Sequence, residues 1–108
     1  MDKVGIFALS LCLAAALVFA APKKEGDAAK GKAVFEQCAV CHNPDSEEKK
    51  VGPGLKGLFK KAKLLSGKKV TDATVLARVN EGGNGMPAYA EMLSDQEKTD
   101  LLAYLKTL

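Results

Sequence analysis

The 108-residue sequence predicts a small all-α domain. Residues typical of helix N-caps stand directly before segments whose apolar residues recur three and four positions apart. No segment alternates apolar and polar residues in the way that a half-buried strand does. The length leaves room for a single domain, so we expect about four short helices packed together.

Residues 1–20 predict a signal peptide, which leaves a domain over residues 21–108. The segment 4–21 is apolar apart from two small residues. Small or aliphatic residues end this run at Ala20 and place the cleavage before Ala21. We therefore expect a periplasmic or otherwise exported protein. The alternative is an uncleaved membrane anchor through residues 4–21, since about 18 apolar residues approach the length that spans a bilayer.

The first two helices are expected in the N-terminal half of the domain. Asp27 is a typical N-cap for a helix over residues 28–35, in which Val34 begins an apolar spacing that continues to Cys38. A second, short helix is expected over Leu55–Lys61.

The other two helices have clearer start signals. Thr71 can cap a helix over residues 72–80, which Gly82 would end. Ser94 and Glu97 form a capping-box pattern, which predicts a helix running to the C-terminus. Its expected buried stripe comprises Leu101, Tyr104, Leu105 and Leu108.

Cys38, Cys41 and His42 form a Cys-x-x-Cys-His motif. Two thiols three positions apart suit one helical turn and can each bond a vinyl group at one edge of a haem. A histidine directly after the second cysteine can coordinate the iron on one face of the ring. The motif therefore predicts one covalently attached haem c.

Three other interpretations of this motif exist. A thioredoxin-type redox site would need a βαβ context, whereas the flanking segments look helical. A structural zinc site needs four ligands, but His42 is the chain's single histidine, and the remaining cysteine, Cys12, lies in the apolar leader. The third alternative is a chance match.

Met86 is the candidate for the second axial ligand. It lies in a loop with glycines and asparagines, which tolerate the positive φ values of a tight turn, and Pro87 follows it directly. A thioether opposite an imidazole gives a six-coordinate iron and raises its reduction potential. The alternative is that Met86 only packs in the core, as most methionines do. Met92, just before the last helix, is a weaker candidate.

From Gly26 to its end, the chain resembles the small class I c-type cytochromes, and is similar in pattern to bacterial cytochrome c2 and mitochondrial cytochrome c. Residues 26–42 carry the strongest part of this resemblance. It implies a cytochrome c fold, in which helices wrap one covalently bound haem and the N- and C-terminal helices cross. The crossing would place Gly31 and Phe35 against Leu101 and either Tyr104 or Leu105.

The segment 51–55 resembles the Gly-Pro-x-Leu segment of that family. The resemblance implies that the carbonyl of Pro53 accepts the Nδ1–H of His42, and that Leu55 packs on the haem face. The chain departs from the family pattern at Gly54, where asparagine is common, and it contains no tryptophan. The resemblance therefore does not identify the groups that would hydrogen-bond the haem propionates.

The charge is mildly basic, with 16 Lys and Arg against 13 Asp and Glu. Eight lysines and no acidic residue fall between positions 49 and 69. In the family that this chain resembles, a lysine ring steers docking to acidic redox partners. The alternative is an ordinary solvated surface. Nucleic-acid binding is not expected, because the net charge is modest and aromatic residues are few.

These observations predict an electron-transfer protein with a single haem. We expect it to act outside the cytoplasm, as a monomer, without enzymatic activity and without a small-molecule substrate. One alternative is a haem sensor or peroxidase-like enzyme with an open sixth iron position, for which the chain has no second histidine. Another is the electron-transfer subunit of a larger oxidoreductase.

Overall fold

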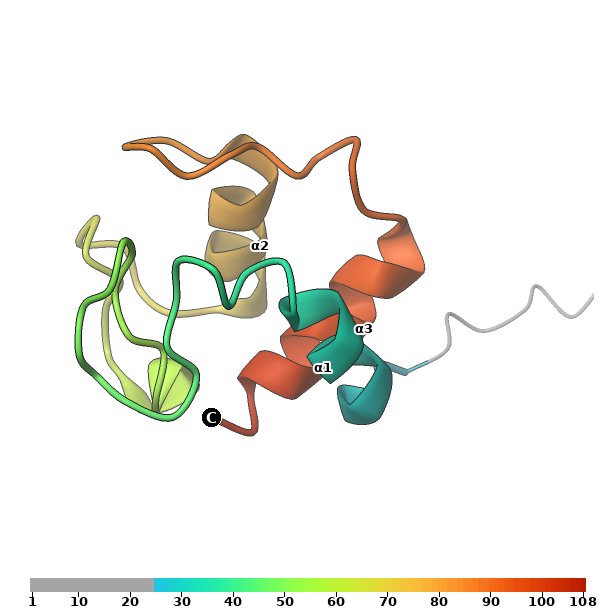
Figure 1. Cartoon of the computed structure of the whole chain (residues 1–108), viewed down its shortest axis with the longest axis horizontal. Coiled ribbons are helices and arrows are strands. Elements are labelled where there is room, and N and C mark those ends of the chain that lie inside the picture. Colours follow the sequence, from blue (N-terminus) through green and yellow to red (C-terminus); the bar gives the residue numbers. More distant parts are fainter. Residues whose placement is uncertain (1–24) are drawn as a thin grey trace, which may run out of the picture.

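The structure, a computed structural model, describes residues 25–108 (Figure 1). The predicted signal peptide, its cleavage before Ala21 and the alternative anchor through residues 4–21 lie outside the described residues. Within residues 25–108, no helix combines the length and the apolar character needed to cross a membrane.

The elements are α1 (Ala28–Phe35), a 3₁₀-helix η1 (Leu58–Lys60), α2 (Asp72–Glu81) and α3 (Asp95–Leu105). Extended pairing within residues 25–108 is limited to two isolated bridges, one between Lys63 and Lys69 and one between Gly83 and Met86. The predicted all-α fold is therefore confirmed. Long loops connect the helices: in the view of Figure 1, the segment between α1 and α2 extends to the left of α2, and the segment between α2 and α3 runs along the top.

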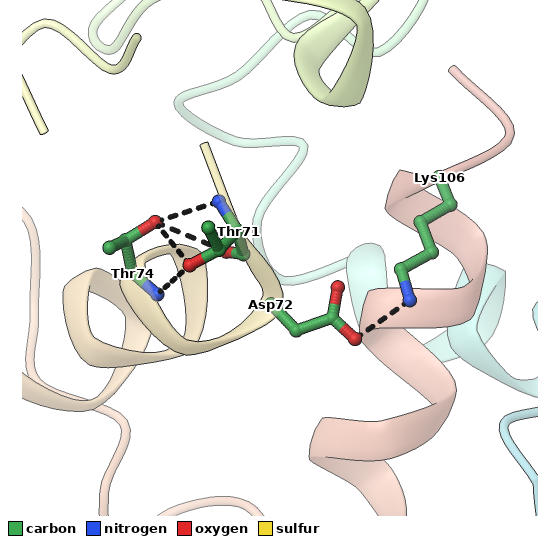
Figure 2. A network of polar contacts seen from close by, with 4 residues as sticks. All are labelled: Thr71, Asp72, Thr74 and Lys106. Carbon is green, nitrogen blue, oxygen red and sulfur yellow. Dashed lines mark hydrogen bonds and ion pairs between the residues drawn. The ribbon is translucent and has the colours of Figure 1, made fainter. Parts of the chain in front are cut away.

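Each α-helix begins where its N-cap residue predicts. The carboxylate of Asp27 accepts hydrogen bonds from two backbone N–H groups of α1, at 2.9 and 3.1 Å. α2 begins with reciprocal bonds between Thr71 and Thr74 (Figure 2), and α3 begins with reciprocal bonds between Ser94 and Glu97. Each cap satisfies N–H groups that have no partner inside the helix, and contributes about 1 kcal/mol of stability.

The helix expected over Leu55–Lys61 is wrong in extent, because only Leu58–Lys60 is helical, as a single 3₁₀ turn. Gly57 precedes that turn with φ of 70°, and Lys61 follows it in an extended conformation. A left-handed residue on one side and an extended residue on the other prevent an α-helix from continuing in either direction.

The last helix ends at Leu105 and does not reach the C-terminus. Beyond it, the backbone N–H and the hydroxyl of Thr107 both donate to the carbonyl of Tyr104, at 2.9 and 2.6 Å. A threonine hydroxyl that bonds to a nearby carbonyl competes with helical hydrogen bonding, which explains the early end. Leu101 and Leu105 are buried as expected, whereas Tyr104 and Leu108 are half-buried.

α1 crosses α3, as the resemblance implied (Figure 1). Gly31 is buried at the crossing, and a Cβ atom there would collide with the backbone carbonyl of Asp100 on α3. The rings of Phe35 and Tyr104 pack beside this contact, with centroids 5.3 Å apart and planes tilted by 55°. The glycine therefore lets the two helix backbones approach more closely than any side chain would permit.

The buried carboxylate of Asp100 links the same two helices. It accepts a hydrogen bond from the backbone N–H of Asp27, at 2.8 Å, and another from the side chain of Gln96, at 3.0 Å. These two bonds, with the nearby charge of Lys30, hold the pKa of Asp100 below its ordinary value although burial opposes them. α3 thus supplies a hydrogen-bond acceptor to the N-cap residue of α1.

The core is small. Its buried apolar side chains come from all three α-helices and from the loop between α2 and α3; they are Phe35, Val75, Val79, Tyr89, Leu93, Leu101 and Leu105. At the edge of the fold, Lys106 forms an ion pair of 2.8 Å with Asp72 (Figure 2) and lies 5.6 Å from the centre of the Phe59 ring. This lysine connects the end of α3 with the start of α2 and with η1.

We expect Gly31→Ala to lower the free energy of unfolding by about 1–3 kcal/mol, because the new methyl group would meet the Asp100 carbonyl. By helix propensity alone, alanine in place of glycine would raise the free energy of unfolding by about 1 kcal/mol. A decrease would therefore show that the two helices are in close contact at this position. Denaturant unfolding of the intact protein measures it. Lys32→Ala, at an exposed position of α1, is the control and should change stability little. A stabilised Gly31→Ala protein would contradict the close crossing.

The lowered pKa of Asp100 predicts a pH-dependent contribution to stability. A carboxyl group whose pKa is lower in the folded state stabilises the fold above its unfolded pKa of about 3.9. That contribution is lost as the pH falls through the lowered value. We therefore expect Asp100→Asn to be less stable than the unmodified protein at pH ~7, with a smaller difference at pH ~3.

Urea unfolding at both pH values measures this difference. Asp45→Asn, at an exposed loop position, is the matched control, and its effect should be small at both. An Asp100→Asn difference of equal size at neutral and acidic pH would show that the ionised carboxylate does not support the helix crossing.

Candidate haem site

Cys38, Cys41 and His42 lie on tight turns that continue directly from the end of α1. The N–H of Cys38 donates to the carbonyl of Phe35 at 2.7 Å, so the chain leaves the helix without a break in hydrogen bonding. The carbonyl of Cys38 then accepts from the N–H groups of Cys41 and His42, at 3.1 and 3.0 Å. The helix crossing therefore fixes the position of the whole motif.

Both cysteines of the motif are free thiols and half-buried. Burial raises the pKa of the Cys38 thiol, and the neighbouring Cys41 raises it further. Burial also raises the pKa of Tyr89, with smaller contributions from the same two cysteines. Tyr89 follows Met86 by three residues. Cys38 and Met86 both pack against the same buried core.

The imidazole of His42 is held by one hydrogen bond. Its Nδ1 lies 2.7 Å from the carbonyl oxygen of Pro53. Because a carbonyl can only accept, Nδ1 carries a proton, and in the neutral ring Nε2 keeps a lone pair for a metal. Such a bond fixes the tautomer and makes the ring a stronger ligand.

Two glycines shape the segment on the other side of this bond. A Cβ atom on Gly52 would lie 2.5 Å from Cε1 of His42, so the Gly52 backbone packs directly against the imidazole ring. The N–H of Gly52 also donates to the carbonyl of Cys41, at 2.7 Å. Gly54 is buried, and a Cβ there would collide with the carbonyl of Ser46. This contact explains why Gly54 stands where the family often has asparagine.

Leu55 lies two residues beyond Pro53 and is half-buried against the core. Its N–H donates to the carbonyl of Asn43 at 2.8 Å, next to the haem motif. The segment 52–55 and the segment 41–43 are thus joined by two backbone bonds and by the bond to His42. The structure therefore brings together Pro53, Leu55 and His42, which the sequence predicts for the histidine side of the site.

Met86 lies at the end of a tight turn after α2. Its N–H and carbonyl pair with those of Gly83, at 3.0 and 2.9 Å. The four residues from Gly82 to Gly85 all have positive φ, between 52° and 119°. Met86 is half-buried against the core, whereas Met92 is 62% exposed. The structure therefore gives Met86, and not Met92, a position next to the apolar interior.

These residues fit a covalently bound haem. The site combines two free thiols, an imidazole with a free ring nitrogen and a thioether. Several apolar side chains around the core are only partly covered by protein, which suits a site that a flat apolar ring completes; they include Leu55, Leu58, Phe59, Leu64 and Val70. Haem has the apolar character that suits such side chains.

Three features of the site are not evident from sequence. The sequence does not indicate that Gly52 packs against His42, because this contact depends on the fold of the loop. Tyr89 is buried in the core, which its position three residues after Met86 does not indicate. Arg78 donates to the carbonyl of Gly82 at 3.0 Å, which the helical periodicity of α2 does not indicate.

Comparisons with known proteins agree with this geometry. The family model for cytochrome c matches residues 28–108. The chain is 31% identical to cytochrome c2 of Blastochloris viridis, with 94% of this chain and 88% of the relative covered. It is 32% identical to a cytochrome c6 of Picosynechococcus sp., with 97% and 92% covered.

A solved structure supports the same assignment. The chain resembles cytochrome c6 from the diatom Phaeodactylum tricornutum with a TM-score of 0.60 and 29% sequence identity, over 76% of this chain and 93% of that one. The family assignment implies one haem c, bonded through cysteines, and Cys38 and Cys41 provide the pair that it requires. Its sequence, its fold and its cysteine-histidine motif show that the chain belongs to the cytochrome c family of single-haem electron carriers.

Proposed function

We propose that this protein carries single electrons between redox partners outside the cytoplasm, with His42 and Met86 as the two axial ligands of its haem iron. The observation that carries this proposal is the bond between His42 Nδ1 and the Pro53 carbonyl, which leaves Nε2 free for a metal. Bound haem supplies a one-electron couple between ferric and ferrous iron. Cys38 and Cys41 hold the ring, and Leu55 covers part of its face.

The chain's own residues favour a carrier over an enzyme. With an imidazole on one side and a thioether on the other, both axial positions are filled by side chains, so a small molecule has no open position. Peroxidase-like chemistry also needs an acid–base group beside an open position, usually a second histidine, and His42 is the chain's single histidine. The protein thus works without a small-molecule substrate.

The surface beside the thiols has the character of a docking site. Val40 lies between the two cysteines and is 69% exposed, as is Val51. Val51 is adjacent to Gly52, whose N–H bonds to Cys41, so Val51 lies next to the motif that contains Val40. Lys50 lies over the same segment, since its Nζ donates to the carbonyl of Ala39 at 3.1 Å.

Two exposed valines with Lys50 over the same segment fit a transient interface. A small apolar centre excludes water, while the lysines steer an acidic partner without tight binding. All eight lysines between positions 49 and 69 are exposed. The protein accordingly acts as a monomer that meets partners with acidic docking surfaces, in the periplasm or another exported location, and binds no nucleic acid.

We expect Met86→Ala to bind carbon monoxide in the ferrous state and to lower the reduction potential by on the order of 0.1 V, because the thioether stabilises ferrous iron. Optical spectra under carbon monoxide and a redox titration measure the two effects. Met92→Ala is the matched control, because Met92 is exposed and should change neither property. If Met86→Ala behaves like Met92→Ala, Met86 is not a ligand.

We also expect the lysines near the thiols to control the rate of electron exchange. In Lys49→Glu/Lys50→Glu, oxidation of the reduced protein by the ferricyanide anion should be several-fold slower at low salt. Added salt should reduce this difference, because it screens the charges. Oxidation by the cation tris(phenanthroline)cobalt(III) should instead become faster.

The control for this experiment is Lys30→Glu/Lys32→Glu, which makes the same charge change on exposed positions of α1. Stopped-flow rates with both oxidants over a range of ionic strength give the comparison. Equal effects of the two double variants would mean that net charge, and not the surface around Val40 and Val51, determines the rate.

A further inference from the structure

The loop that carries Met86 starts from the last turn of α2 and has little conformational preference of its own. Gly82, Gly83, Asn84 and Gly85 all adopt positive φ, and three of the four are glycines. Glycine has no side chain that could form stabilising contacts, and it loses more backbone conformational entropy than other residues when a loop is ordered. A loop of this kind needs contacts from outside to hold one conformation.

Arg78 supplies such a contact. From α2, its Nη1 donates to the carbonyl oxygen of Gly82 at 3.0 Å, and the N–H of Gly82 donates back to the Arg78 carbonyl at 2.8 Å. The guanidinium also lies against Gly83, since a Cβ there would be 3.2 Å from Nη1. One side chain thus fixes the orientation of the peptide where the helix ends and the loop begins.

Gly82 passes this constraint directly to Met86. It is buried, and a Cβ atom on it would collide with the carbonyl of Met86 and lie 2.7 Å from atoms of Pro87. Gly83 then pairs with Met86 through two backbone hydrogen bonds. Two contacts therefore lead from the guanidinium of Arg78 to the backbone of Met86, without a flexible segment between them.

We propose that Arg78 is a positioning residue for Met86, which keeps the methionine loop closed and limits how readily the thioether leaves the iron. This inference rests on the proposed role of Met86 as an axial ligand. Arginine suits the task because its planar, permanently charged group keeps its hydrogen-bonding geometry. Charge-assisted bonds to a carbonyl are also stronger than neutral ones.

The test compares Arg78→Leu, Arg78→Lys and Lys106→Leu with the unmodified protein, all carrying haem at neutral pH. Imidazole can bind ferric iron only after the methionine leaves, so its binding rate at saturating imidazole reports the opening of the loop. We expect Arg78→Leu to raise that rate about threefold to tenfold, with Arg78→Lys in between. Lys106→Leu loses an exposed cation and its bond to Asp72, and should leave the rate unchanged.

A second readout does not depend on the iron. Amide hydrogen exchange at Gly83 and Met86, whose N–H groups form the closing bonds of the turn, should become faster in Arg78→Leu while amides of α1 and α3 stay unchanged. Equal imidazole rates and equal exchange in Arg78→Leu and the unmodified protein would overturn the role of Arg78. So would a uniform loss of protection throughout the molecule, which would mark general destabilisation.

The two readouts also separate this inference from the role of Met86. If imidazole binds the unmodified protein at once and Met86→Ala does not change its rate, Met86 is not a ligand and the role of Arg78 at the iron falls with it. If Met86→Ala accelerates binding but Arg78→Leu does not, Met86 keeps its role and only Arg78 loses its own.

Discussion

The close contact between Gly31 and the backbone of Asp100 is the constraint on which the rest of the structure depends. Because α1 lies directly on α3, the end of α1 has a fixed position, and the turns that carry Cys38, Cys41 and His42 follow without interruption. Asp100 reinforces the crossing by accepting the N–H of Asp27. A small protein with few buried side chains needs such local precision, because its own core supplies limited stability.

The site itself is built mainly from loops, and backbone hydrogen bonds give these loops their definition. On one side, the segment of Pro53 is tied to the cysteine motif and to the ring of His42. On the other, the turn at Gly83 and Met86 is closed by its own pair of bonds and is held by Arg78. We propose that these two loops, one following α1 and one following α2, present different ligands to one cofactor.

The sequence predicts the helices well where caps define them. Asp27, Thr71 and Ser94 begin helices because short polar side chains satisfy N–H groups locally, which requires no knowledge of the fold. The limits of the turn at Leu58–Lys60 and the early end at Leu105 were not predicted, because apolar spacing reflects neither the left-handed backbone of Gly57 nor the hydroxyl bond of Thr107.

For the site, the motif names Cys38, Cys41 and His42, and the surrounding glycines point to Met86. Pro53 and Leu55 came from family resemblance alone, and the roles of all six residues at the haem stay predictions. The contact of Gly52 with His42 and that of Arg78 with Gly82 depend on how the loops fold, and the burial of Tyr89 depends on the packing of the whole core. Spacing along the chain contains no signal for contacts of that kind.

The most direct test of the account is an optical redox titration of the unmodified protein with its haem attached. We predict a single one-electron transition between two low-spin states, with the weak far-red charge-transfer band of methionine–iron ligation in the oxidised form and no reaction of the reduced form with carbon monoxide. A high-spin oxidised spectrum without that band, together with ready binding of carbon monoxide, would contradict ligation by His42 and Met86 and would favour a sensor or a peroxidase-like enzyme.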